Sequence, residues 1–152
     1  LKLAVVERHH NLGNIGLAIV HGCGLKEGAV ATTVAHDSHN AIVVGTNDDD
    51  MIKALEALQE MQGGLVVVKN GEVMGALNLP IAGLMTNEAA KDVVSQLEKV
   101  HEALHEIYPT LSYHFFLTLS FLSLPVIPEL KVTDTGLFDV VQFKHIETEV
   151  RM

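Results

Sequence analysis

Apolar residues in the first third of the chain occur in short β-branched runs, separated by glycine and polar residues. Runs of this kind predict strands. Four of them are expected, at residues 1–7, 17–21, 29–35 and 41–44. Five consecutive polar residues separate the last two: His36, Asp37, Ser38, His39 and Asn40. The pattern therefore predicts two buried strands joined by a polar loop.

The middle of the chain changes to helical spacing. Asn47 is a typical N-cap, and aspartates at 48–50 favour the positive end of a helix. The helix is expected to end at Gly63-Gly64. Strands at 65–69 and 72–79, joined by Asn70-Gly71, then predict a hairpin.

A longer apolar stripe predicts a second helix that opens at Thr86 and stops before Pro109. Periodicity cannot separate helix from strand over 111–128, and a last strand is expected at 137–143 after a turn at 133–136. We expect one α/β (α+β) domain over residues 1–152. Its sheet is mixed or antiparallel, built from hairpins and packed by two or three helices.

Composition narrows the possible partners. The net charge is −9 without a basic cluster, which argues against nucleic acid or an anionic membrane surface. The apolar segment at 115–127 is too short to cross a bilayer. A single cysteine, Cys23, fits a reducing, cytoplasmic compartment. A 48% hydrophobic content and a mean hydropathy of +0.28 suggest an excised piece that lacks a covering partner surface, as does a start at Leu1.

The polar loop has two interpretations. Asp37 and Ser38 can satisfy nearby backbone groups, which would make the loop a closed polar turn. Two imidazoles exceed what a turn requires, so His36 or His39 could instead act as a ligand or a general acid or base, oriented by Asp37.

Other short patterns give weaker evidence for a chemical site. His101, Glu102 and His105 form a His-Glu-x-x-His sequence, the helical arrangement of zinc proteases, for which Glu129 is the only sensible third ligand. A solvated helix face explains the same residues. The Arg8-His9-His10 run fits a surface turn better than a metal or anion site. Cys23 is more readily a small packed residue than a nucleophile.

Several motifs in order along the chain resemble the C-terminal region of microbial adenine deaminases. They include the polar loop with its flanks at 33–40, and the motifs at 7–10, 13–16, 24–29, 63–68, 79–85 and 119–128. The poorest match is 108–116.

The resemblance implies an enzyme of the amidohydrolase superfamily that hydrolyses adenine to hypoxanthine and ammonia in purine salvage. It also implies that the divalent metal, manganese or iron, lies in an upstream barrel domain. This segment alone is therefore expected to be inactive and to hold neither metal nor cofactor. Its expected partners are that barrel, adenine as substrate of the full enzyme, and another copy in a homo-oligomer.

Three hypotheses follow. Residues His36 to Asn40 could complete or cover the barrel's active site. The domain could be purely structural, supporting the barrel or an oligomer interface. An independent zinc hydrolase built on His101, Glu102 and His105 is the third.

Overall fold

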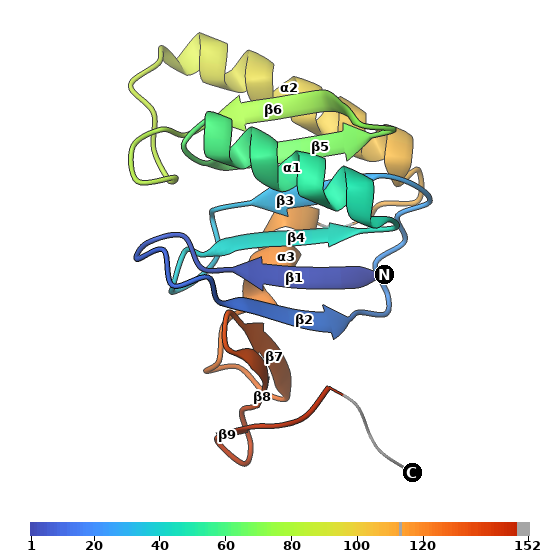
Figure 1. The fold of residues 1–152 in the computed structure, drawn as a ribbon. Helices are drawn as coiled ribbons and strands as arrows, with labels where there is room; N and C mark the ends of the chain where they lie inside the picture. Colours follow the sequence, from blue (N-terminus) through green and yellow to red (C-terminus); the bar gives the residue numbers. More distant parts are fainter. Residues whose placement is uncertain (113, 149–152) are drawn as a thin grey trace.

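The computed structural model describes residues 1–112 and 114–148, which form two antiparallel sheets and three helices. The main sheet has six strands in the order β2-β1-β4-β3-β5-β6 (Figure 1). Their bounds are β1 Lys2–Val6, β2 Ile15–Ile19, β3 Ala29–Thr32, β4 Ala41–Gly45, β5 Gly64–Lys69 and β6 Glu72–Asn78. The helices are α1 Asp48–Glu60, α2 Ala90–Ile107 and α3 Phe115–Phe121. The expected α+β class with an antiparallel sheet is confirmed.

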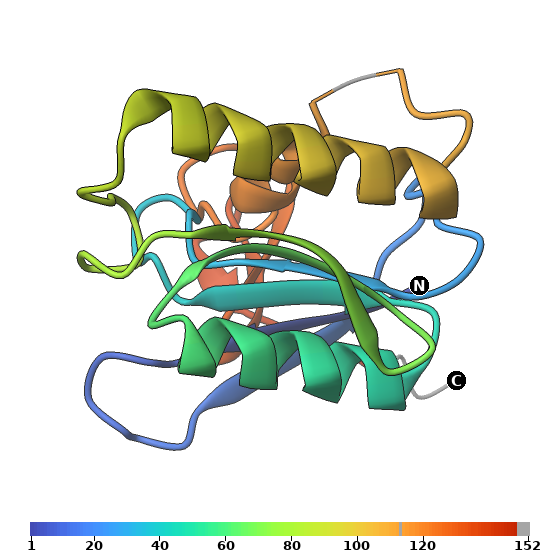
Figure 2. The same ribbon diagram turned by 90° about the horizontal axis from the view of Figure 1, so that it is seen from above.

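Both faces of the central strands are buried. Helix α1 covers one face, and α2 and α3 lie on the other (Figure 2). Along β4, Ile42 and Val44 point into the α2 side, whereas Ala41 and Val43 point into the α1 side. Burial on both faces explains why these strands read as continuous apolar runs instead of alternating ones.

The start of α1 agrees with its sequence signals. Asn47 Oδ1 accepts the Asp50 amide at 2.8 Å, and the Asn47 amide group donates to Asp50 Oδ2 at 2.8 Å. The buried Asp50 also accepts the Gly71 amide at 2.7 Å, which ties the helix to the β5–β6 turn. In that turn, Asn70 and Gly71 both have positive φ, as the predicted hairpin requires.

Several expected boundaries were wrong. Strand β2 covers Ile15–Ile19 and not 17–21, because Ile15 and Gly16 already pair with Val6 and Val5 of β1. Strand β3 ends at Thr32, so the connection to β4 is longer than the polar pentapeptide. Helix α2 begins at Ala90, because Thr86 Oγ1 accepts the Glu88 amide in a turn before the helix. Strand β8 covers only Gly136–Asp139.

The tail that sequence left ambiguous forms α3 and a second sheet. Strands β7 Leu130–Thr133, β8 and β9 Lys144–His145 pair in that order and lie against the β2 edge of the main sheet (Figure 1). Within the described ranges, no helix has the length and apolar character needed to cross a membrane.

Candidate functional site

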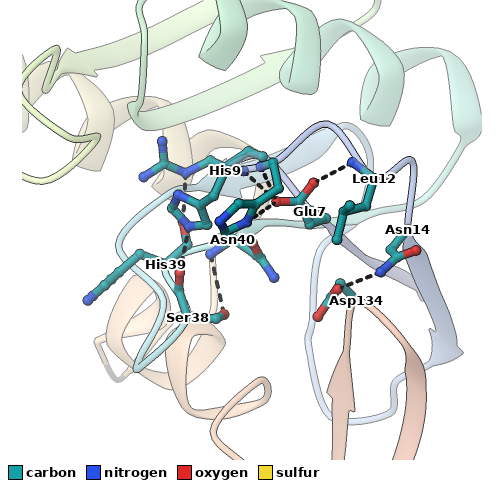
Figure 3. A network of polar contacts seen from close by, with 10 residues as sticks. Glu7, His9, Leu12, Asn14, Ser38, His39, Asn40 and Asp134 are labelled. Carbon is teal, nitrogen blue, oxygen red and sulfur yellow. Dashed lines mark hydrogen bonds and ion pairs between the residues drawn. The ribbon is translucent and has the colours of Figure 1, made fainter.

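The polar pentapeptide lies where three connections meet at one end of the main sheet. These are the β1–β2 loop, the β3–β4 loop and the segment after β6. Strand β1 pairs with β4 so that Val6 lies opposite Ala41. This register brings the residues that follow β1 beside the residues that precede β4 (Figure 3).

Glu7 organises the first of these loops. Its carboxylate accepts the backbone amides of His9 at 2.6 Å, His10 at 2.7 Å and Leu12 at 3.0 Å. The Glu7 side chain is only 5% exposed. The hydrogen bond from Leu12, with those from His10 and His9, outweighs burial and lowers the pKa of Glu7 to about 2. The loop is therefore built around a charged carboxylate.

Arg8 and His9 connect this loop to the other two. Arg8 Nε donates to the His39 carbonyl at 2.6 Å, and Arg8 Nη2 donates to the Ala82 carbonyl at 2.6 Å. His9 Nε2 lies 2.7 Å from the Ser38 carbonyl oxygen (Figure 3). The sequence alone predicts only a surface turn at residues 8–10. Only the pairing of β1 with β4 reveals that these residues hold the pentapeptide.

The pentapeptide is thus anchored mainly through its backbone. Asp37 and Ser38 at its tip are exposed, and His36 and His39 are partly buried. Within the tip, the Asn40 amide lies 3.4 Å from Ser38 Oγ. The shorter bond that closes the turn joins backbone groups, from the His39 amide to the Ala35 carbonyl at 2.7 Å.

The two imidazoles lie edge to face, with ring centroids 5.8 Å apart. The His36 ring also stacks on Phe121 of α3, with centroids 6.0 Å apart. Burial, the nearby His36 and Arg8 lower the pKa of His39, which favours its neutral imidazole. His39 can therefore give or accept a hydrogen bond without adding charge.

Two buried polar atoms of the loop have no hydrogen-bond partner within the described part of the chain: His39 Nδ1 and Asn40 Oδ1. Buried polar atoms without partners are rare in folded proteins and usually have a functional or structural reason. Both belong to residues that the sequence marked as candidates.

Thr33 holds the third connection in place. Its hydroxyl donates to the Gly83 carbonyl at 2.7 Å and accepts the Gly64 amide at 2.8 Å. A Cβ on Gly83, where φ is +74°, would lie 2.5 Å from Arg8 Nη2. The 79–85 motif therefore needs glycine here so that Arg8 can reach across.

The rival chemical motifs lie elsewhere. His101, Glu102 and His105 are exposed on α2. Across residues 1–112 and 114–148, no three or more His, Cys, Asp or Glu side chains are grouped to hold a metal ion. Cys23 is half-buried, and burial raises the pKa of its thiol, which disfavours the reactive thiolate.

Comparison with known proteins agrees with the resemblance to adenine deaminases that the sequence motifs indicate. Residues 1–144 match the family model described as the adenine deaminase C-terminal domain. An adenine deaminase of Lysinibacillus sphaericus is 62% identical over 149 residues, or 98% of this chain. That of Bacillus subtilis is 53% identical over 149 residues, and adenine deaminase 2 of Carboxydothermus hydrogenoformans is 54% identical over 142 residues.

The chain belongs to the adenine deaminase C-terminal domain family. It spans about a quarter of the length of these relatives: 26% for Lysinibacillus and Bacillus subtilis, and 25% for Carboxydothermus. The expected resemblance is confirmed over nearly the whole chain.

Proposed function

We propose that this chain acts as the C-terminal domain of an adenine deaminase, whose full-length form hydrolyses adenine to hypoxanthine and ammonia. The support is that relatives named adenine deaminase match nearly all of this chain at 53–62% identity. The remaining three quarters of such a protein would contain the catalytic barrel and its manganese or iron. Among the described residues, no three or more His, Cys, Asp or Glu side chains are grouped to bind that metal. This domain would therefore contribute to the reaction without binding the metal itself.

Within that enzyme, we propose that residues 36–40 cover the active site of the barrel. One observation supports this most strongly: the loop is anchored through the His39 and Ser38 carbonyls, and the Asp37 and Ser38 side chains are exposed at its tip. A loop fixed by its backbone on a rigid sheet can present its side chains without first ordering them.

The chemistry of the side chains fits a covering role. A neutral His39 can share a hydrogen bond with an uncharged heterocycle such as a purine, and Asp37 can accept from an amino group. Closing the site would exclude water and strengthen the polar interactions inside it. His36, backed by Phe121, would supply a flat wall.

The test uses full-length enzyme carrying His36→Ala, His39→Ala or both. Loss of these contacts should lower kcat/KM roughly tenfold or more in the double variant, a cost of about 1.4 kcal/mol in the transition state. Ammonia release from adenine measures this. The paired change His101→Ala with His105→Ala is the matched control, because these exposed histidines lie on α2, and its activity should stay unchanged.

Unchanged kinetics in the double variant, with the melting temperature preserved, would reject the covering role. The second candidate, a purely structural or oligomer-forming domain, would then be favoured. The exposed aliphatic side chains of β2 support this second candidate. Loss of activity in the α2 control would instead revive the zinc-hydrolase hypothesis.

A further inference from the structure

The two faces of the main sheet are covered unequally. Helix α1 packs over β3, β4, β5 and β6, and β1 and β2 lie to one side of it (Figure 1). Opposite residues of antiparallel strands share a face, and Leu17 lies opposite Ala4, which belongs to the α1-side core. Ala4 itself is buried, whereas Leu17 beside it is 61% exposed, so the open part of this face lies over β2.

Strand β2 presents its large side chains on this uncovered face. Ile15, Leu17 and Ile19 are 56%, 61% and 80% exposed. Its small residues, Gly16 and Ala18, point to the opposite, covered face. A strand that needed only its own domain would have the reverse arrangement, with aliphatic residues inside and polar residues outside.

The same apolar surface extends to α1. Ile52 on this helix is 55% exposed, and it shares a hollow with Val6 and Leu55, whose lining also includes polar residues such as Glu7, Arg8 and Gln59. We call Ile15, Leu17, Ile19, Val6 and Ile52 the β2 patch. One end is marked by the exposed ion pair of Lys2 with Asp48, 2.7 Å apart. An apolar area with a polar rim on an edge strand is a typical interaction surface.

We infer that the β2 patch is the surface on which the preceding part of the same polypeptide packs. Relatives are about four times as long as the matched segment, and that segment is a C-terminal domain. The preceding residues would join at Leu1. Leu1 is held beside β2 by reciprocal backbone bonds with Val20, each 2.9 Å long, so the junction lies at the Ile19 end of the patch.

The opposite end of the patch leads to the candidate site. Beyond Ile15 the chain continues into the β1–β2 loop, where Leu12 is 64% exposed and Arg8 holds the pentapeptide. A domain seated on the patch would therefore extend from its junction with Leu1 to residues 36–40. This inference rests on the proposed function only in taking the chain as part of a longer adenine deaminase; its test does not depend on deamination.

The test measures thiol labelling in the full-length protein. Leu17→Cys reports on the patch, and Val94→Cys, on the exposed side of α2 and 53% exposed, is the matched control, both with Cys23→Ala. Labelled peptides are quantified by mass spectrometry and normalised to the denatured protein. If the patch is covered, Leu17→Cys should label at least about tenfold more slowly than Val94→Cys, because only the transiently opened fraction reacts.

Dilution separates the possible occupants. Protection that persists when the protein is diluted to a monomer, as checked by light scattering, supports packing within one polypeptide. Protection that disappears with dilution would assign the patch to a second copy and overturn the inference. Equal labelling of the two positions would overturn it as well. Either result leaves the proposed role of residues 36–40 to the kinetic test, so the two proposals can fail separately.

Discussion

At the scale of single residues, the loop that holds the pentapeptide depends on the ionisation of Glu7. Its two carboxylate oxygens together accept the backbone amides of His9, His10 and Leu12. These bonds favour the charged form and hold its pKa at about 2, against an ordinary value of 4.5. Because the folded pKa is the lower one, ionised Glu7 stabilises the fold above pH 4.5, and this contribution disappears as the pH falls towards 2.

Replacing Glu7 by Gln should reveal this dependence. The amide keeps one acceptor oxygen but loses the charge and the second oxygen, so the variant should melt at a lower temperature at pH 7. The difference from the native protein should shrink between pH 4.5 and about 2, since the native carboxylate itself becomes protonated there. Thermal unfolding across this range is the measurement. A difference that stays constant with pH would show that the Glu7 charge is not responsible.

At the scale of secondary-structure elements, Asp50 joins two of them. It forms the reciprocal cap of α1 with Asn47 and also accepts the Gly71 amide in the β5–β6 turn. Burial alone would raise the pKa of Asp50, but the hydrogen bonds from Asn47, Gly71 and Asn70 lower it overall. The helix start and the hairpin turn therefore share one buried carboxylate.

Removing this carboxylate should destabilise both elements together. Asp50→Ala should lower the free energy of unfolding by about 2–3 kcal/mol, because it removes a cap and leaves the Gly71 amide without its charged acceptor. Asp49→Ala is the matched control, since Asp49 lies in the same helical turn but is exposed. Denaturant unfolding of both variants gives the comparison. An equal loss in the two would mean that the helix dipole, and not the shared bonds, explains the effect.

At the scale of the whole molecule, the two sheets meet where β2 carries Gly16. An added Cβ there would lie 1.7 Å from the Thr133 carbonyl oxygen of β7. A second contact joins the same two segments: the side-chain amide of Asn14, just before β2, donates to the carboxylate of Asp134, just after β7, at 3.2 Å. The small sheet can approach the β2 edge this closely only because Gly16 has no side chain.

Gly16→Ala should therefore separate the sheets. We expect a loss of about 1–3 kcal/mol, typical of overpacking, with faster hydrogen exchange in β7 and β8. Exchange in β5 should be unchanged, because it lies on the far side of the main sheet. Uniformly faster exchange would indicate that the two sheets unfold as one unit.

Much of this architecture could be predicted from short stretches of sequence. Asn47 with its three aspartates predicted the start of α1, and Asn70-Gly71 predicted the β5–β6 turn, because caps and tight turns depend on a few adjacent residues. The pentapeptide was recognisable as a polar interruption between buried strands. The resemblance to adenine deaminases could also be read from the motifs, since it requires only their order.

The surroundings of the pentapeptide were decided by tertiary structure. The pairing of β1 with β4 places Arg8 and His9 against the His39 and Ser38 carbonyls, and strand order is not encoded in the period of any one strand. The unequal covering of the sheet, which exposes Leu17, likewise depends on where α1 packs. Local sequence determined the elements and the polar loop because their causes are short-range. Only the fold decided what the loop contacts and which apolar face stays open, because those contacts join residues far apart in the chain.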